Sequence, residues 1–146
     1  MNKAFVREPE EKRDRCPSCG TTGIAVFDVT LNAWLGPEQR QQLSEAACFC
    51  SHETCDVAYF DGFDRVIPAA EMATPVWPKD REAPVCPCFG LKCSDIQADV
   101  DEDSVARVRQ TIQRAQSDEA RCGTMSPSGQ SCVAAVQKCY MRLRGQ

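Results

Sequence analysis

Strand-forming residues and turn signals alternate through the first half of the chain. Residues 24–30 are rich in the β-branched and aromatic residues that strands prefer, and residues 46–50 and 55–60 are expected to form further strands. Asp61-Gly62 then predicts a hairpin turn that leads into another strand over residues 63–67. Pro37 starts a short predicted helix that continues over residues 38–43. This pattern predicts a small antiparallel sheet with one helical insertion.

The second half of the chain follows a helical period instead. Val105, Val108, Ile112 and Ala115 recur at spacings of three and four, which predicts an amphipathic helix of about three turns. Ser94-Asp95 predicts the cap of a shorter helix that runs to Val100, and a final helix is expected over residues 133–141.

Together the two periods predict an α+β protein in which the sheet precedes the helices. Four segments are expected: a flexible N-terminus over residues 1–15, a β subdomain over 16–70, a linker over 71–83 and a helical subdomain over 84–146. The linker is inferred from the prolines and charges that surround Trp77.

The 11 cysteines change this picture most, because an odd number fits poorly with a closed set of disulfides. The charged N-terminus has no apolar core of a signal peptide, and no apolar run is long enough to cross a bilayer. We therefore expect a cytoplasmic protein without membrane insertion, in which clustered thiols bind metals or carry redox chemistry.

Charge and composition argue against two classes of function. The formal net charge is −4, from 21 acidic and 17 basic residues, which argues against a nucleic-acid backbone as the main partner, since such binding needs a concentrated positive field. The acidic balance also weighs against DNA binding through a zinc motif. One histidine, and no recognisable nucleophile–base pair, carboxylate pair or phosphate loop, make an enzyme the weakest interpretation.

The β half contains a pattern of four cysteines that is typical of a closed tetrahedral zinc site. The ligands would be Cys16, Cys19, Cys50 and Cys55, in the spacing C-x2-C and C-x4-C. A rubredoxin-like iron site or a redox dithiol are the alternatives. Cys48 lies one strand period from Cys50 and could compete as a ligand, whereas His52 is not counted as one.

The helical half contains a second set of four. Cys86-Pro87-Cys88 places two thiols one residue apart, and Cys122 and Cys132 follow beyond the amphipathic helix. Thiolates in loops at helix starts suit a [2Fe–2S] cluster, which needs four cysteine ligands. A second zinc site is the alternative, although CxC is an unusual spacing for zinc.

These motifs together resemble the N-terminal domain of CopZ-type copper chaperones. The resemblance rests on Cys16-Pro17-Ser18-Cys19-Gly20, on residues 49–60, on residues 85–90 and on the ending that includes Cys122 and Cys132. The helical half is also similar to bacterioferritin-associated ferredoxin. The resemblance implies one zinc at the first four cysteines and one [2Fe–2S] cluster at the second four. The chain departs from the family at Ser131, where a cysteine is usual, and the second, copper-binding domain of these chaperones is not among its residues.

We therefore expect a redox protein with zinc and a [2Fe–2S] cluster that transfers electrons during the handling of copper or another heavy metal. Its partners would be metal ions such as copper or mercury and a redox or metal-transport protein. Two alternatives stay open: an adaptor module in which both metals are structural, and a soft-metal buffer or sensor. The latter would use the thiols that match no ligand position, which are Cys48, Cys93 and Cys139.

Overall fold

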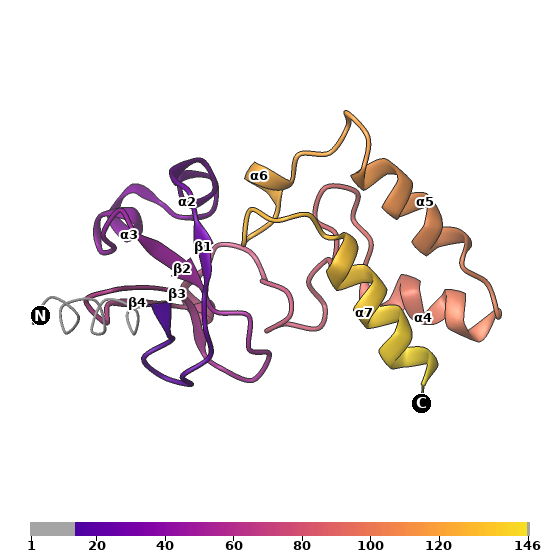
Figure 1. Cartoon of the computed structure of the whole chain (residues 1–146), viewed down its shortest axis with the longest axis horizontal. Coiled ribbons are helices and arrows are strands. Elements are labelled where there is room, and N and C mark those ends of the chain that lie inside the picture. Colours follow the sequence, from indigo (N-terminus) through magenta and orange to yellow (C-terminus); the bar gives the residue numbers. More distant parts are fainter. Residues whose placement is uncertain (1–13, 146) are drawn as a thin grey trace, which may run out of the picture.

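Four short strands form one antiparallel sheet in the N-terminal half, and each strand pairs with the next one along the chain (Figure 1). The strands are β1 (Ile24–Val26), β2 (Ala47–Phe49), β3 (Val57–Asp61) and β4 (Val66–Pro68). The computed structural model describes residues 14–145, so most of the predicted flexible N-terminus lies outside the described residues. Arg15, the second described residue, is already bridged to Thr22. The α+β architecture expected from the sequence is confirmed.

The predicted strand over residues 24–30 is wrong beyond Val26. Helix α2 (Asp28–Trp34) begins two residues later, with the acidic Asp28 in its first turn, where the helix dipole favours negative charge. Thr30 and Leu31 are both buried in this helix. Burial of this face outweighs the strand preference of its β-branched residues, because tertiary packing commonly overrides local propensity.

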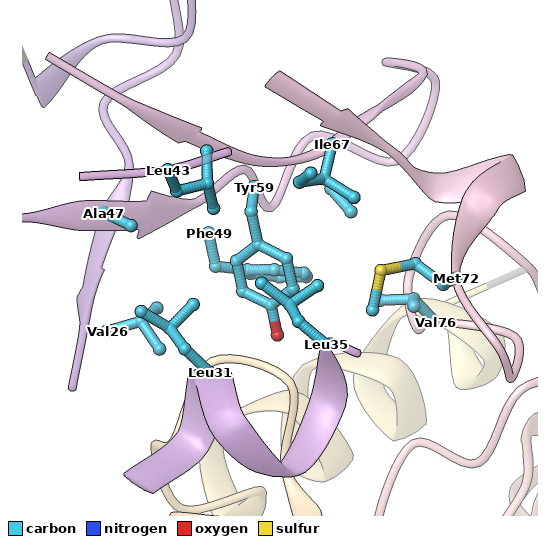
Figure 2. Close-up of a cluster of buried hydrophobic side chains, with 11 residues drawn as sticks. Val26, Leu31, Leu35, Leu43, Ala47, Phe49, Tyr59, Ile67, Met72 and Val76 are labelled. Atoms are coloured by element: carbon cyan, nitrogen blue, oxygen red, sulfur yellow. The ribbon is translucent and has the colours of Figure 1, made fainter. Parts of the chain in front are cut away.

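Helix α2 covers the sheet and closes the larger of the two main cores (Figure 2). Leu31 lies beside Val26, and Leu35, which follows the helix, lies next to the rings of Phe49 and Tyr59, which meet edge to face with centroids 5.5 Å apart. Ile67 of β4 is fully buried in the same cluster. The predicted helix after Pro37 is confirmed as α3 (Pro37–Gln41), and the 3-10 turn η2 (Ala69–Glu71) follows β4.

The C-terminal half is helical, as predicted. Its elements are α4 (Cys93–Asp101), α5 (Ala106–Ala115), the short α6 (Cys122–Met125) and α7 (Val133–Arg144). The cap of α4 is Lys92 and not Ser94; the Lys92 N–H donates to the Asp95 carboxylate at 2.9 Å. Ile96, Val108 and Val136 come from three different helices and meet in one buried cluster. No helix among residues 14–145 is long and apolar enough to cross a membrane.

Buried contacts connect the two halves. The Thr30 hydroxyl donates to the Gly123 carbonyl, and the Tyr59 hydroxyl donates to the Pro127 carbonyl. Gly129 has a φ of +74°, and a Cβ there would lie 2.6 Å from Thr30 Oγ1, so only glycine fits this approach. The turn before Cys132 is thereby held against the sheet half.

The segment expected as a linker is itself packed. Val76 is 2% exposed and belongs to the core under the sheet, whereas the next residue, Trp77, is half-buried against the helical cluster. Adjacent residues of this segment thus contribute to the two different cores.

Asp61 organises the β3–β4 hairpin and is 1% exposed. Its carboxylate accepts hydrogen bonds from the backbone N–H groups of Ser44, Phe63 and Arg65 at 2.8–3.1 Å, and from Arg65 Nε at 3.0 Å. Burial acts to raise the pKa of Asp61, but these donors outweigh it and hold the pKa below its ordinary value.

We expect Asp61→Asn to destabilise the protein by about 2–4 kcal/mol at neutral pH, because the amide NH₂ would face donors. Because the folded-state pKa is depressed, this contribution is present above the ordinary aspartate pKa and is lost as the pH falls through the folded value. Denaturant unfolding of both proteins across the acid range measures this difference. Asp64→Asn, an exposed change in the same turn, is the matched control. Equal stability of Asp61→Asn and wild type at pH 7 would contradict this role.

Candidate metal centres

The first loop of the chain presents two cysteines on a tight turn. The Gly20 N–H donates to the Cys16 carbonyl at 2.8 Å, and the Cys16 N–H donates to the Thr21 carbonyl at 2.9 Å. Gly20 has a φ of +77°, a left-handed conformation that favours glycine. This turn brings the side chains of Cys16 and Cys19 to the same side of the loop.

The connection between β2 and β3 supplies the other two ligands. Cys50 follows β2 directly and its N–H donates to the Ala58 carbonyl at 2.9 Å, which extends the strand pairing by one bond. Cys55 lies two residues before β3. Both cysteines are therefore placed by the sheet and not by a free loop.

The four Sγ atoms converge as one zinc ion requires. All lie within 4.8 Å of one another; Cys16 and Cys55 are 3.8 Å apart, and Cys19 and Cys50 are 3.6 Å apart. Zinc–sulfur bonds of about 2.3 Å in a tetrahedron give sulfur–sulfur separations of about 3.8 Å. Cys19 is exposed and the other three are buried. The arrangement fits a closed zinc site, whereas Cys48 and His52 lie outside the set.

Burial and hydrogen bonds shift the pKa values of these thiols in opposite directions. Burial raises the pKa of Cys50 to about 12. At Cys19 burial also acts to raise the pKa, but hydrogen bonds with Thr21 outweigh it and lower the pKa to about 6. A bound zinc ion would favour the thiolate form of all four, because its positive charge lies next to each sulfur.

The sequence pattern did not indicate Lys79 as part of this site. Its ammonium donates to the carbonyl groups of His52 and Cys55 at 2.8 and 3.1 Å, and its charge acts to lower the pKa of Cys50. Four thiolates around Zn²⁺ leave an excess of negative charge, which a nearby ammonium offsets. No local motif marks Lys79, because its role depends on how the 71–83 segment folds back.

The Cys86 loop repeats the backbone of the first loop. The Gly90 N–H donates to the Cys86 carbonyl at 2.8 Å, the Cys86 N–H donates to the Leu91 carbonyl at 3.1 Å, and Gly90 has a φ of +72°. The second cysteine of this loop, Cys88, follows the first by two residues, whereas Cys19 follows Cys16 by three. Phe89 therefore occupies the position that corresponds to Cys19, and its ring lies 4.2 Å from the Arg114 guanidinium.

The four cysteines of the C-terminal half lie near enough to one another to shift each other's pKa values. A hydrogen bond from the Cys132 thiol lowers the pKa of Cys86 to about 7, and the same bond, together with burial, raises the pKa of Cys132. Burial raises the pKa of Cys88, and the adjacent thiols of Cys122 and Cys86 raise it further. The Arg121 N–H also donates to Cys88 Sγ at 3.4 Å.

The Sγ atoms of the C-terminal cysteines are further apart than those of the first set. Within residues 14–145, the C-terminal cysteines form no group of three or more whose Sγ atoms all lie within 4.8 Å. The two sets of cysteines therefore differ in geometry as well as in spacing along the sequence.

Comparisons with known proteins agree with the first site. Residues 13–72 match the CopZ family described as "Zinc binding domain", which covers all four ligands of the closed site. The chain is 35% identical over 75 residues to the copper chaperone CopZ of Archaeoglobus fulgidus. That alignment covers 51% of this chain and 36% of the relative, so about a third of the relative's length is matched.

The structural similarity covers more of the chain than the sequence similarity does. The X-ray structure of the Archaeoglobus fulgidus CopZ N-terminal domain superposes with a TM-score of 0.72 at 26% identity. The superposition covers 85% of this chain and 95% of that one, so the helical half has a counterpart as well. Residues 13–72 are thus similar to the zinc-binding domain of CopZ proteins and include all four cysteines of the closed site, Cys16, Cys19, Cys50 and Cys55.

Proposed function

We propose that this protein is a cytosolic one-electron carrier that serves the handling of copper or another heavy metal. In this proposal Cys86, Cys88, Cys122 and Cys132 hold a [2Fe–2S] cluster, and the zinc in the other half is structural. The domain boundaries proposed from the sequence place these two centres in the segments 84–146 and 16–70.

The observation that carries the proposal is the wider spacing of the second cysteine set, in which no three Sγ atoms of the described residues lie within 4.8 Å of one another. The pKa of Cys86 responds most to Cys132, and the pKa of Cys88 responds to both Cys122 and Cys86. A binuclear cluster needs two thiolates on each of two irons, whereas a single zinc needs all four sulfurs around one point. The first set meets the zinc requirement and the second does not, which favours the binuclear cluster.

The residues around the second set suit a redox centre. Backbone N–H groups donate to the sulfurs of Cys86 and Cys88, and such hydrogen bonds are one means by which proteins tune cluster potentials. The Arg114 charge acts on Cys86 from its place over Phe89. When bound, the cluster would supply reversible uptake and release of one electron.

Two of the four cysteines are more exposed than the other two, which suits electron transfer to a partner protein. Cys86 and Cys132 are buried, whereas Cys88 and Cys122 are half-buried and lie beside the exposed backbone of Arg121 and Gly123. This edge is where a redox or metal-transport protein could approach most closely. The zinc set offers no comparable role, because four thiolates close it and leave no position for a substrate.

The link to metal handling rests on the relative that is named a copper chaperone. Because this chain matches only part of that protein, copper handling is part of the proposal. The thiols of Cys48, Cys93 and Cys139, which belong to neither cysteine set, are consistent with copper handling because soft cations select thiolate ligands.

Reversible reduction of the anaerobically purified protein tests the proposal. We expect thiolate-to-iron absorption in the visible range that bleaches with a one-electron reductant and returns on reoxidation. The circular dichroism should stay unchanged, because a carrier must keep its fold in both states. A protein that binds iron but unfolds on reduction would be an adaptor with structural metals. A protein without iron would contradict the proposal.

A further inference from the structure

Two thiols outside both cysteine sets face each other between α4 and α7. Cys93 is the first residue of α4 and Cys139 lies in the middle of α7, and their Sγ atoms are 3.9 Å apart. Cys139 is 7% exposed and Cys93 is half-buried. The two residues are 46 positions apart in the sequence, so only the packing of the two helices brings them together.

We propose that Cys93 and Cys139 form a third metal site, which binds a soft monovalent cation such as Cu(I). Thiolates are the ligands that soft cations of this class select. The separation of 3.9 Å nearly equals the 3.8 Å between Cys16 and Cys55, two ligands of the zinc set. The pair therefore already has the spacing of two ligands on one ion.

Surface hollows make this site open, in contrast to the zinc set. A cavity of about 240 Å³ is lined by Cys139 together with Lys138 and Arg142. A second hollow is lined by Cys93, Lys92 and Gln97. With only two protein sulfurs and access from solvent, the remaining coordination positions stay free for an exchanging ligand. We therefore expect the ion to be acquired and released, and not to be a structural part of the fold.

Local charges favour a monovalent ion. Two thiolates and one monovalent cation leave one net negative charge. Burial and the neighbouring Cys93 thiol raise the pKa of Cys139 to about 11, whereas the guanidinium groups of Arg142 and Arg81 act in the opposite direction and would offset the charge of the bound site. Arg142 is fixed by Glu53, whose two carboxylate oxygens each accept a hydrogen bond at 2.9 Å. The positive end of α4 lies at Cys93 and acts in the same direction.

A disulfide is the competing use of such a pair. It would require the sulfurs to close from 3.9 Å to about 2.05 Å. The neighbours of both thiols in α4 and α7, such as Ile96 and Val136, are fully buried in one cluster, which holds the helices in place. The metal site needs no such closure.

Competition with a chromophoric Cu(I) chelator tests the site in the full chain, with zinc and iron loaded and oxygen excluded. The wild type should withdraw one Cu(I) per chain from the chelator. Cys93→Ser and Cys139→Ser should each lose that ion while their zinc and iron contents stay unchanged. Cys48→Ser, at the remaining unassigned thiol, is the matched control and should retain it. Equal withdrawal by wild type and Cys93→Ser, or its loss in Cys48→Ser alone, would overturn the proposal.

A second measurement needs no variant. One equivalent of Cu(I) should block alkylation of Cys93 in the wild type, as read by mass spectrometry of its peptide. The same alkylation with and without Cu(I), or a Cys93–Cys139 crosslink in the anaerobic protein that excludes Cu(I), would contradict the site. The result is independent of the proposed electron carrier, because a chain that lacked iron would still bind Cu(I) through these thiols.

Discussion

Replacing Cys50 with alanine should release the zinc and unfold the sheet half of the protein. Cys50 is fully buried, and Cys16, Cys55 and Val57 form a separate small core with it. That core contains few large apolar side chains, so the bound ion replaces much of the hydrophobic contact that would otherwise hold the first loop. Structural zinc in small domains contributes about 10–16 kcal/mol of apparent binding energy, which is also folding energy. Loss of one buried ligand should therefore remove most of the stability of this half.

Zinc content by elemental analysis and thermal unfolding by circular dichroism measure this result. Cys48→Ala is the matched control, because Cys48 lies on the same strand two residues earlier and outside the ligand set. The control should keep its zinc and its melting transition, apart from a smaller loss from the packing of a half-buried side chain. A Cys50→Ala protein that keeps zinc and melts like the control would show that the four thiols are not one site.

Replacing Cys132 with alanine should abolish the proposed cluster and leave the zinc in place. Cys132 is 5% exposed at the start of α7, and its thiol donates to Cys86. Because the two cysteine sets belong to different buried clusters, loss of one should not disturb the other. The expected result is loss of the visible absorption and of iron, with unchanged zinc content.

Cys139→Ala provides the control for this experiment. It removes a buried thiol from the same helix, two turns further on, and should leave the iron content unchanged. If Cys132→Ala retained full iron and absorption, the ligand assignment would be wrong at this position. If it lost zinc as well, the two sites would not be separate.

Local sequence patterns predicted much of this architecture. The Cys16-Pro17-Ser18-Cys19-Gly20 motif predicted a tight turn, and Gly20 has the left-handed conformation that such a turn favours. The period of the apolar residues around Val108 predicted α5 within a few residues of its ends. These features are encoded within a few positions of each other, so one sequence is enough to recognise them.

Features that depend on distant packing were not predicted. Residues 28–30 were predicted as part of a strand, but they form a helix because Leu31 and Leu35 pack onto the sheet. The contact of Lys79 with the zinc loop and the pairing of Cys93 with Cys139 each join residues that are far apart in sequence. No local period or motif marks such contacts. The three-dimensional arrangement was therefore needed to separate the spare thiols into a pair and a lone Cys48.

The metal and sulfide content of the anaerobically purified chain tests the central claim most directly. Elemental analysis, acid-labile sulfide and the visible spectrum should together give one zinc, two irons and two sulfides per chain, with thiolate-to-iron absorption. This stoichiometry would assign a mononuclear and a binuclear site to the two cysteine sets. Two zinc ions per chain, with neither iron nor labile sulfide, would contradict the account.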